Sequence, residues 1–217
     1  MRKQFLEQLK NLRSEIINLY DLVHRNVELL RICLEDDNLE KQKIDSYERD
    51  QKIRKKGMEI EKICIELLSL QHPVAKDLRL IVTVLKFLND FQRISRNSLH
   101  ILEELVEIHP IQSEKYRRVL RQLIETIVFM LQEIYTSIVS NTPSSSDVLI
   151  ESDNVIDLRY EELSTILHED LEKKKISWKQ AMAFIKIARF FERIGDHICN
   201  IGERWFYTES GERTIIK

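Results

Sequence analysis

Residues that interrupt helices are scarce in this sequence. Its 217 residues include only four glycines and three prolines. Because glycine and proline are the strongest breaks in regular structure, their scarcity excludes a many-turned β architecture and favours long helices. The hydrophobic share is 43% and the charged share is 32%, which suffices for a core and a well-hydrated surface. We therefore expect an all-α protein of one or two small domains.

An excess of charge of either sign is also missing. The 34 basic and 36 acidic residues leave a formal net charge of −2, so the basic footprint of a nucleic-acid-binding protein is absent. No run of eighteen apolar residues occurs, and the charged segment 1–16 is not a secretory signal, so we expect no membrane span. Cys33, Cys64 and Cys199 have no CxxC spacing, which predicts reduced core residues of a cytoplasmic protein.

Apolar residues recur at helical spacing between five short polar breaks. The pattern predicts six helices at 3–35, 39–70, 74–108, 112–141, 145–173 and 177–208. Helices of about 30 residues span roughly 45 Å and suit a long antiparallel bundle. Pro73 and Pro110 are expected in first turns, where proline is tolerated. Ser144, Ser145 and Ser146 offer N-cap oxygens to the fifth helix.

The chain repeats itself with an offset of 100 residues. Segment 86–103 aligns without gaps on segment 186–203. The identical pairs are Lys86/Lys186, Phe91/Phe191, Arg93/Arg193, Ile94/Ile194, Ile101/Ile201 and Glu103/Glu203. We therefore predict two tandem three-helix bundles, a first repeat at 1–108 and a second at 109–217, which can pack as one body.

The last predicted helix carries small residues every seven positions, namely Ala181, Ala188, Gly195 and Gly202. A glycine inside a helix costs about 1 kcal/mol relative to alanine, so this stripe predicts the close approach of another helix. Glu192, Asp196 and Glu203 lie along one edge of the stripe. Lys186, Arg193 and His197 occupy the opposite, polar face, and we interpret His197 as a surface residue and the other histidines as structural or exposed.

The fifth predicted helix has a matching carboxylate pair. Asp153 and Asp157 stand four apart on the edge of its apolar stripe. If the two helices pack antiparallel, four carboxylates face each other and need protonation, arginine partners or a cation. Oxygen ligands suit Mg, Mn or Fe, and Zn less well. The alternative is that each pair belongs to a hydrated helix face.

Catalytic signatures are missing from the sequence. It has no Glu-x-x-His motif of di-iron bundles and no glycine-rich phosphate loop. No Ser/His/Asp set stands out either.

Three segments resemble the PhoU family of bacterial phosphate-signalling regulators. They are QHPVAKDLRLIVTVLKFLNDFQRI (71–94), ESDNVIDLRYEEL (151–163) and FFERIGDHICNIGE (190–203). The resemblance covers essentially the whole chain. It implies two three-helix bundles side by side, generally in a homodimer, with carboxylate motifs that hold a metal cluster in each repeat.

Transferred to this sequence, the family's metal ligands in the second repeat are Asp153, Asp157, Glu192 and Asp196. In the first repeat only one carboxylate remains, Asp50, while Arg54, Gln92 and Arg96 replace the others. A guanidinium places a permanent positive charge where a cation would bind. We therefore predict a divalent or iron-type metal in the second repeat only, with Arg54 or Arg96 neutralising Asp50, and the protein as purified can be metal-free altogether.

Asp77 and Arg79 belong to the DLR element near the start of the third predicted helix. An aspartate there favours the helix dipole. The resemblance offers the alternative that Asp77 and Arg79 contact a partner.

The resemblance implies a cytoplasmic adaptor without enzymatic activity. It would couple the ATPase subunit of a phosphate ABC transporter to a sensor histidine kinase, peripheral to the membrane, and restrain phosphate uptake and the phosphate-starvation response. Two other functions stay open from the residues: a metal-dependent hydrolase that uses the carboxylates of the second repeat, and a metal-free helical scaffold.

Overall fold

The computed structural model describes residues 2–35, 39–71, 73 and 75–216, and all regular structure in them is helical. The helices are α1 (Arg2–Cys33), α2 (Leu39–Gln71), α3 (Ala75–Ile108), α4 (Glu114–Ser140), α5 (Ser146–Glu172) and α6 (Trp178–Ser210). Each predicted helix is confirmed, with ends displaced by no more than two residues. The predicted break at 36–38, the predicted helix start at 74 and His72 lie outside the described residues.

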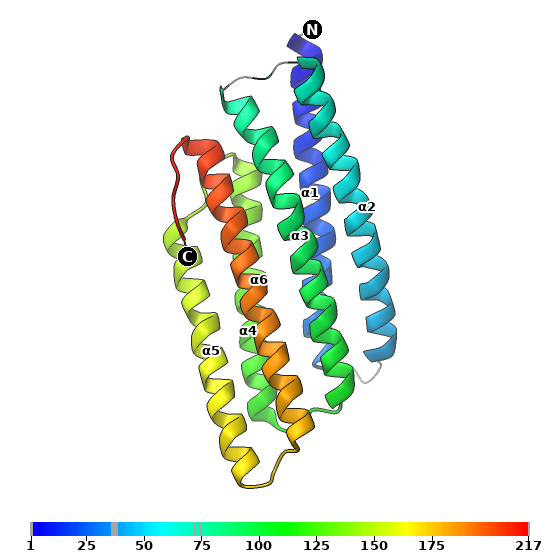
Figure 1. The fold of residues 1–217 in the computed structure, drawn as a ribbon, viewed down its shortest axis with the longest axis vertical. Helices are drawn as coiled ribbons and strands as arrows, with labels where there is room; N and C mark the ends of the chain where they lie inside the picture. The colour runs from blue at the N-terminus through cyan, green and yellow to red at the C-terminus, as the bar shows by residue number, and fades with distance from the viewer. Residues whose placement is uncertain (1, 36–38, 72, 74, 217) are drawn as a thin grey trace.

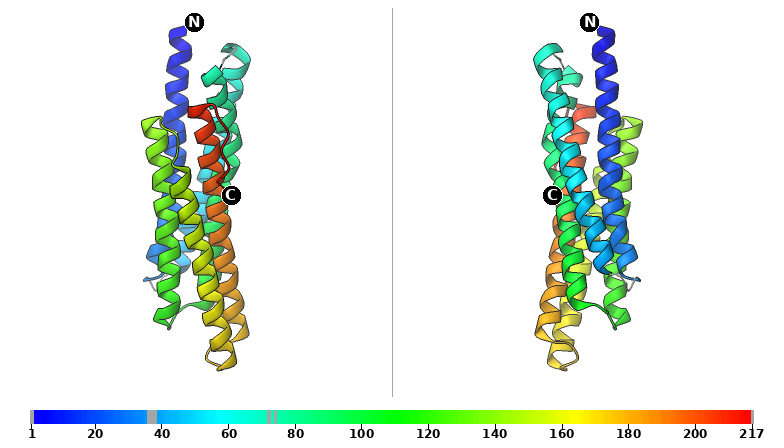
Figure 2. Two further views of the ribbon diagram at one scale, coloured as in Figure 1. Left: turned by 90° about the vertical axis from the view of Figure 1, so that its left-hand side faces the viewer. Right: turned by 90° about the vertical axis from the view of Figure 1, so that its right-hand side faces the viewer.

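The six helices form two layers of unequal width. In the broad layer the order is α5, α6, α3, α2, and each helix packs against the next (Figure 1). The narrow layer consists of α4 and α1, which pack against each other and cover one side of the broad layer (Figure 2). The three-plus-three arrangement therefore becomes one body, joined through α3 with α6 and through α1 with α4.

One continuous hydrophobic core contains buried side chains from all six helices. Phe87 and Phe91 of α3 meet edge to face with ring centroids 5.5 Å apart. Trp205 of α6, fully buried, donates its indole N–H to the carbonyl oxygens of Ser137 (3.1 Å) and Thr142 (2.9 Å) in the second repeat. Burial of such large apolar groups is the dominant favourable term in folding, so the two repeats are stabilised together.

The line along which α3 and α6 pack, the α3–α6 seam, has approximate twofold symmetry. Lys186 Nζ lies 2.9 Å from Glu104 Oε1, and Arg204 Nη1 donates to the carbonyl oxygen of Lys86 at 3.2 Å. The two contacts occupy equivalent positions, because Lys86 and Lys186 are 100 residues apart, as are Glu104 and Arg204. The repeat recognised in the sequence is thus also a repeat of contacts.

A buried aspartate connects α3 to α6 at the centre of this seam. Asp90 of α3 is only 3% exposed, and its carboxylate contacts Nδ1 of His197 at 2.9 Å and the guanidinium of Arg204. The expectation that His197 is a surface residue is therefore wrong. The side chain of His197 is 23% exposed, whereas Lys186 and Arg193 on the same face of α6 are exposed, because His197 turns towards Asp90 of α3.

Two predictions about helix starts have different outcomes. Ser145 is the N-cap of α5, and its hydroxyl accepts from the N–H of Val148 at 3.5 Å, which confirms the predicted cap. Pro73 and Pro110, however, lie before the helices that follow them and not in their first turns. Ser113, three residues after Pro110, is the N-cap of α4.

Helix α4 bears on the expectation of no membrane span, which stays a prediction. It is the one helix in the described chain that is long and apolar enough to do so, by length and composition alone. The sequence of α4 contains no uninterrupted run of eighteen apolar residues, because isolated polar residues divide it. Core helices of globular proteins pass the same test, and Leu123, Ile127 and Ile134 of α4 are fully buried against the other helices.

Candidate metal centre and its counterpart in the first repeat

The small-residue stripe of α6 lies against α5. A Cβ atom at Gly195 would come within 2.8 Å of Ile156 Cδ1 and 3.1 Å of Asp153 Oδ1. At Gly202 it would overlap Cδ1 of Leu149. Both glycines are therefore required by close helix packing, as the sequence predicts. The same contact places the carboxylate of Asp153 against the backbone of α6.

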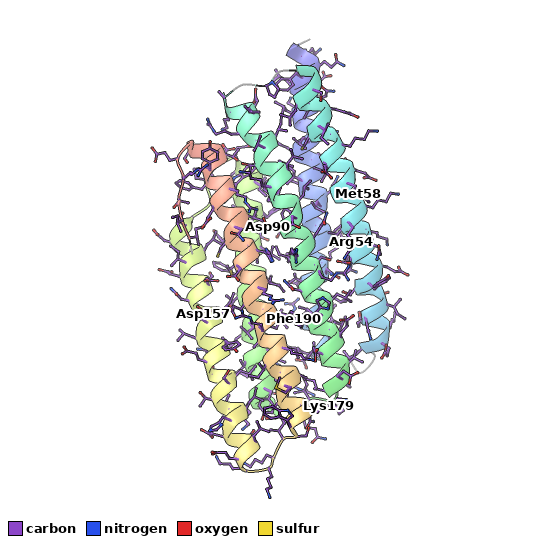
Figure 3. The ribbon with its side chains drawn as sticks, in the orientation of Figure 1. Arg54, Met58, Asp90, Asp157, Lys179 and Phe190 are labelled. Atoms are coloured by element: carbon purple, nitrogen blue, oxygen red, sulfur yellow. The ribbon has the colours of Figure 1, made fainter. Side chains whose placement is uncertain are left out.

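The four predicted metal ligands share one seam without converging on one point. Asp153 is buried at 7% exposure, Glu192 and Asp196 are half-buried, and Asp157 is exposed on α5 (Figure 3). Both oxygens of Glu192 accept from Nη1 of Arg189 at 2.7 Å. Nowhere in the described residues do three Asp, Glu, His or Cys side chains stand close enough to hold one ion.

The donor set suits a hard cation, since all four side chains offer carboxylate oxygens. The side-chain positions do not suit a cation, because Arg189 of the same helix neutralises Glu192. Arginine pairing is one of the ways in which clustered carboxylates are stabilised without a metal. The metal centre of the second repeat therefore stays a prediction.

The counterpart in the first repeat is an ion-pair network around a buried aspartate. Asp50 of α2 is fully buried. Its Oδ2 accepts from Arg54 Nε at 3.1 Å and from Arg96 Nη2 at 2.8 Å. Its Oδ1 accepts from the hydroxyl of Ser95 at 3.0 Å. Both arginines thus neutralise Asp50, as expected from the sequence.

The two repeats position their buried aspartates in the same way. Asp153 Oδ1 faces Gly195, and Asp50 Oδ1 faces Ser95, one hundred residues earlier. Asn26 of α1 extends the network of the first repeat, because its amide donates to the Ser95 hydroxyl at 3.1 Å. Sequence reasoning missed Asn26. The available signal was a lone amide on an otherwise apolar helix face.

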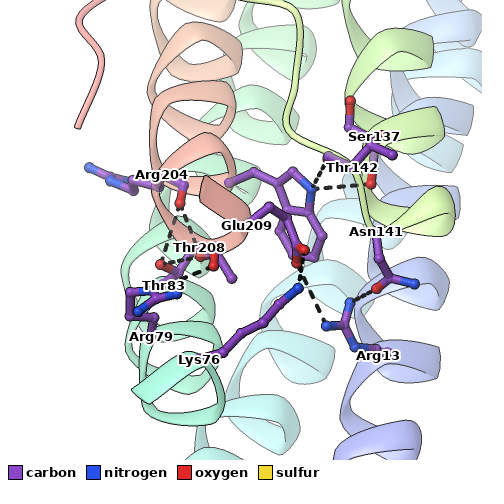
Figure 4. Close-up of polar contacts among 11 residues, drawn as sticks. Arg13, Lys76, Arg79, Thr83, Ser137, Asn141, Thr142, Arg204, Thr208 and Glu209 are labelled. Atoms are coloured by element: carbon purple, nitrogen blue, oxygen red, sulfur yellow. Dashed lines mark hydrogen bonds and ion pairs between the residues drawn. The ribbon is translucent and has the colours of Figure 1, made fainter. Parts of the chain in front are cut away.

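The DLR element contacts the carboxyl-terminal end of α6 (Figure 4). Arg79 Nε donates to the carbonyl oxygen of Thr208 at 3.5 Å, and its guanidinium lies 6.0 Å from the ring centroid of Tyr207. A cation at a helix C-terminus is favourable. Asp77 lies in the first turn of α3, where a negative charge is favourable for the same reason. Both residues thus have a structural role, and a partner contact through them stays a prediction.

Sequence reasoning missed an acidic group next to Arg79. The carboxylate of Glu209 is 2% exposed and lies 2.5 Å from Lys76 Nζ and 3.8 Å from Arg13 Nη2 (Figure 4). Burial lowers the pKa of Arg13, against the opposing effect of Glu209. The cluster joins α1, α3 and α6. Its partners are far apart in sequence, so periodicity gave no signal for it.

A pocket of about 570 Å³ lies at the opposite end of the bundle, among residues that include Glu107, Tyr116 and Phe184. Asp170 Oδ2 is there 2.5 Å from Lys115 Nζ and accepts from the Tyr116 hydroxyl at 2.5 Å. These bonds, that of Lys115 first, lower the pKa of Asp170, while burial raises the pKa of Tyr116. The charges around this pocket are balanced.

Comparison with protein families gives one match that covers most of the chain. The PhoU domain model matches residues 16–105 and again 120–205. Among curated proteins, the chain is 28% identical over 212 residues to "Phosphate-specific transport system accessory protein PhoU homolog 1" of Thermotoga maritima, covering 96% of this chain and 90% of that protein. It is 24% identical over 223 residues to the PhoU homolog of Borreliella burgdorferi, covering 100% and 99%.

Two solved structures have a similar fold. The phosphate transport system regulatory protein PhoU from Streptococcus pneumoniae superposes with a TM-score of 0.86 at 24% identity, covering 97% of this chain and 99% of that one. PhoU from Pseudomonas aeruginosa gives a TM-score of 0.82 at 24% identity, covering 96% and 100%. The layered six-helix arrangement is therefore shared with both.

Proposed function

The chain belongs to the PhoU domain family, and on this premise we propose that it is an accessory regulator of phosphate transport rather than an enzyme. The observation that carries the proposal is the repeated family match, which spans both repeats. The curated relatives that align over nearly the whole chain are named as accessory proteins of phosphate-specific transport. A non-catalytic role is consistent with carboxylates engaged in ion pairs at both candidate centres.

The more specific proposal is a cytoplasmic adaptor, peripheral to the membrane, between the ATPase subunit of a phosphate ABC transporter and a sensor histidine kinase. In this role it restrains phosphate uptake and the phosphate-starvation response when phosphate is plentiful. An adaptor needs accessible contact surface. The outer face of α2 offers Ile44, Tyr47, Met58 and Ile65, each more than half exposed. Exposed apolar side chains on one helix face favour a protein contact, and a homodimer is a second proposed use of such a face.

Deletion of the gene in its source organism tests the regulatory role. We expect phosphate uptake in phosphate-rich medium to rise and starvation genes to be expressed, and both to return to normal on complementation. A pull-down from phosphate-rich cells should recover the transporter ATPase subunit. Unchanged uptake in the deletion strain would contradict the proposal. Phosphate-ester hydrolysis by the purified protein that is lost in Asp196→Asn would contradict the non-enzymatic role.

We also propose that Asp153, Asp157, Glu192 and Asp196 bind a divalent or iron-type metal once Glu192 leaves Arg189. The metal would neutralise the carboxylates and hold α5 to α6. Elemental analysis after loading should give stoichiometric metal in the native protein and in Asp50→Asn, but not in Asp157→Asn or Glu192→Gln. Equal metal content in all four proteins would contradict this assignment.

A further inference from the structure

We propose that the first repeat binds a phosphate oxyanion between α2 and α3, through Arg54, Arg96 and Gln92. The site occupies the positions where the family pattern would place metal ligands, with the charge reversed. The inference deepens the proposed function and rests on it only for the choice of phosphate among oxyanions. The geometry itself stands on the contacts around Asp50.

Two guanidinium groups converge on a single oxygen atom. Arg54 and Arg96 each donate one N–H to Oδ2 of Asp50, at 3.1 Å and 2.8 Å. An arginine has five N–H groups, so most donors of the pair remain. The arginine side chains are 47% and 31% exposed, whereas Asp50 is fully buried. The buried carboxylate therefore orients the two guanidiniums from the core side. The N–H groups on their solvent side remain accessible.

The network also lacks an acceptor. Nε of Arg96 is shielded from solvent and makes no hydrogen bond to any described residue. Buried donors are nearly always paired in native proteins. An oxyanion that enters the seam beside Arg96 would supply this acceptor, and the exposed N–H groups of both arginines would bind its other oxygens.

Gln92 supplies a third polar group on the same face of α3, one turn before Arg96. Its amide lies across Gly57 of α2, so that a Cβ there would come within 2.6 Å of Nε2. The half-buried amide has no hydrogen-bond partner in the described part of the chain. The absence of a side chain at Gly57 therefore leaves room for the amide in the seam between the two helices.

The charge of the first-repeat site favours an anion. Asp50, Arg54 and Arg96 together carry a net charge of +1, whereas the four carboxylates of the second repeat with Arg189 carry −3. Segment 49–56 of α2 contains five basic residues and one acidic residue. Arginine forks match the geometry of phosphate oxygens, and a surrounding positive field raises the local concentration of anions.

Calorimetric titration of the full-length protein with inorganic phosphate, at constant chloride and with EDTA present, tests the proposal. We expect one site per chain. Arg54→Gln should weaken binding about tenfold or more, as expected for loss of a charged hydrogen bond. The matched control Lys52→Gln removes an exposed charge from the same helix and should change the affinity only slightly.

Two results would overturn the site: no phosphate binding by the native protein, or equal affinities in Arg54→Gln and Lys52→Gln. Binding that occurs only when EDTA is omitted would also overturn it, because the phosphate would then be held through a metal. A second arm uses phosphatidylcholine vesicles with and without phosphatidic acid. Arginine-dependent retention on the acidic vesicles without a response to free phosphate would reject inorganic phosphate as the ligand. A negative titration leaves the deletion phenotype unaffected, so the two proposals fail independently.

Discussion

At the scale of single residues, Gly202 and Gly57 show two different reasons for a glycine inside a helix. Gly202 faces Leu149, which is fully buried and surrounded by core side chains. Gly57 faces the terminal amide of Gln92, which is half-buried and can rotate towards water. An added methyl group is therefore resisted at the first position and accommodated at the second.

We predict that Gly202→Ala lowers the free energy of unfolding by about 1–3 kcal/mol, because the methyl group overpacks the contact with α5. Gly57→Ala should be neutral or stabilising by up to about 1 kcal/mol, because alanine is the better helix former. Equilibrium urea unfolding of both variants measures the difference. Equal stability of the two variants would show that α5 does not approach α6 as closely as described.

Predictions from the sequence were correct for single residues whose type at that position has few physical explanations. Arginines in place of acidic ligands predicted the neutralisation of Asp50, and a glycine stripe predicted close packing. Asp90, Glu209 and His197 were missed or misread because their partners lie on helices distant in sequence. A helical wheel shows which residues share a face of one helix. It does not show that two neighbours cover both flanks of that helix.

At the scale of elements, the α3–α6 seam joins the two repeats by contacts of unequal strength. Asp90 is buried and contacts both His197 and Arg204. The pair of Glu104 with Lys186 lies near the surface, with Lys186 54% exposed. Buried charged hydrogen bonds contribute more to stability than exposed ion pairs.

Asp90→Ala is therefore expected to reduce the free energy of unfolding by about 1–3 kcal/mol, since it removes the buried carboxylate that pairs with Arg204 and His197. Glu104→Ala, at the surface of the same seam, should cost less than about 1 kcal/mol. Chemical denaturation monitored by circular dichroism distinguishes the two variants. A larger effect at Glu104 would place the main connection between repeats elsewhere.

The ends of α4 and α5 give a pH-dependent prediction. Lys115 and Tyr116 hold the pKa of Asp170 below its ordinary value. The resulting stabilisation is present above about pH 4, the unfolded pKa, and is lost as pH falls through the lower folded pKa. Lys115→Met should therefore be less stable than the native protein at pH 7, and the difference should shrink as the pH falls below about 4.

The control for this prediction is Lys173→Met, which removes an exposed ion pair with Glu169 on α5. Urea midpoints measured from pH 3 to pH 7 should show no comparable pH dependence for this variant. The same curve for both variants would mean that the Asp170 contact has no specific effect on stability.

At the scale of the whole molecule, the two repeats share one continuous core. The sequence predicted six helices and two repeats, because helical periodicity and a gapless offset are local signals. It did not predict the division into a broad and a narrow layer. That division depends on which helix faces meet, and α6 in particular buries residues towards both α5 and α3.

We expect one cooperative thermal transition with equal calorimetric and van't Hoff enthalpies, because α3 and α6 would both expose apolar surface if the repeats unfolded separately. Differential scanning calorimetry of the full chain measures both enthalpies. Two resolved transitions, or a van't Hoff enthalpy well below the calorimetric value, would show that the repeats are independent.

The α3–α6 seam carries ionic contacts at both ends as well as at its centre. Lys76 meets Glu209 at one end, and Lys179 meets Glu107 at the other. Sliding one repeat along the other by one helical turn would break all of these pairs at once. A small rotation of one repeat about the long axis of the seam would change only the side-chain dihedral angles of these pairs. The paired charges would stay in contact. The seam therefore permits hinge bending between the two repeats more readily than shear.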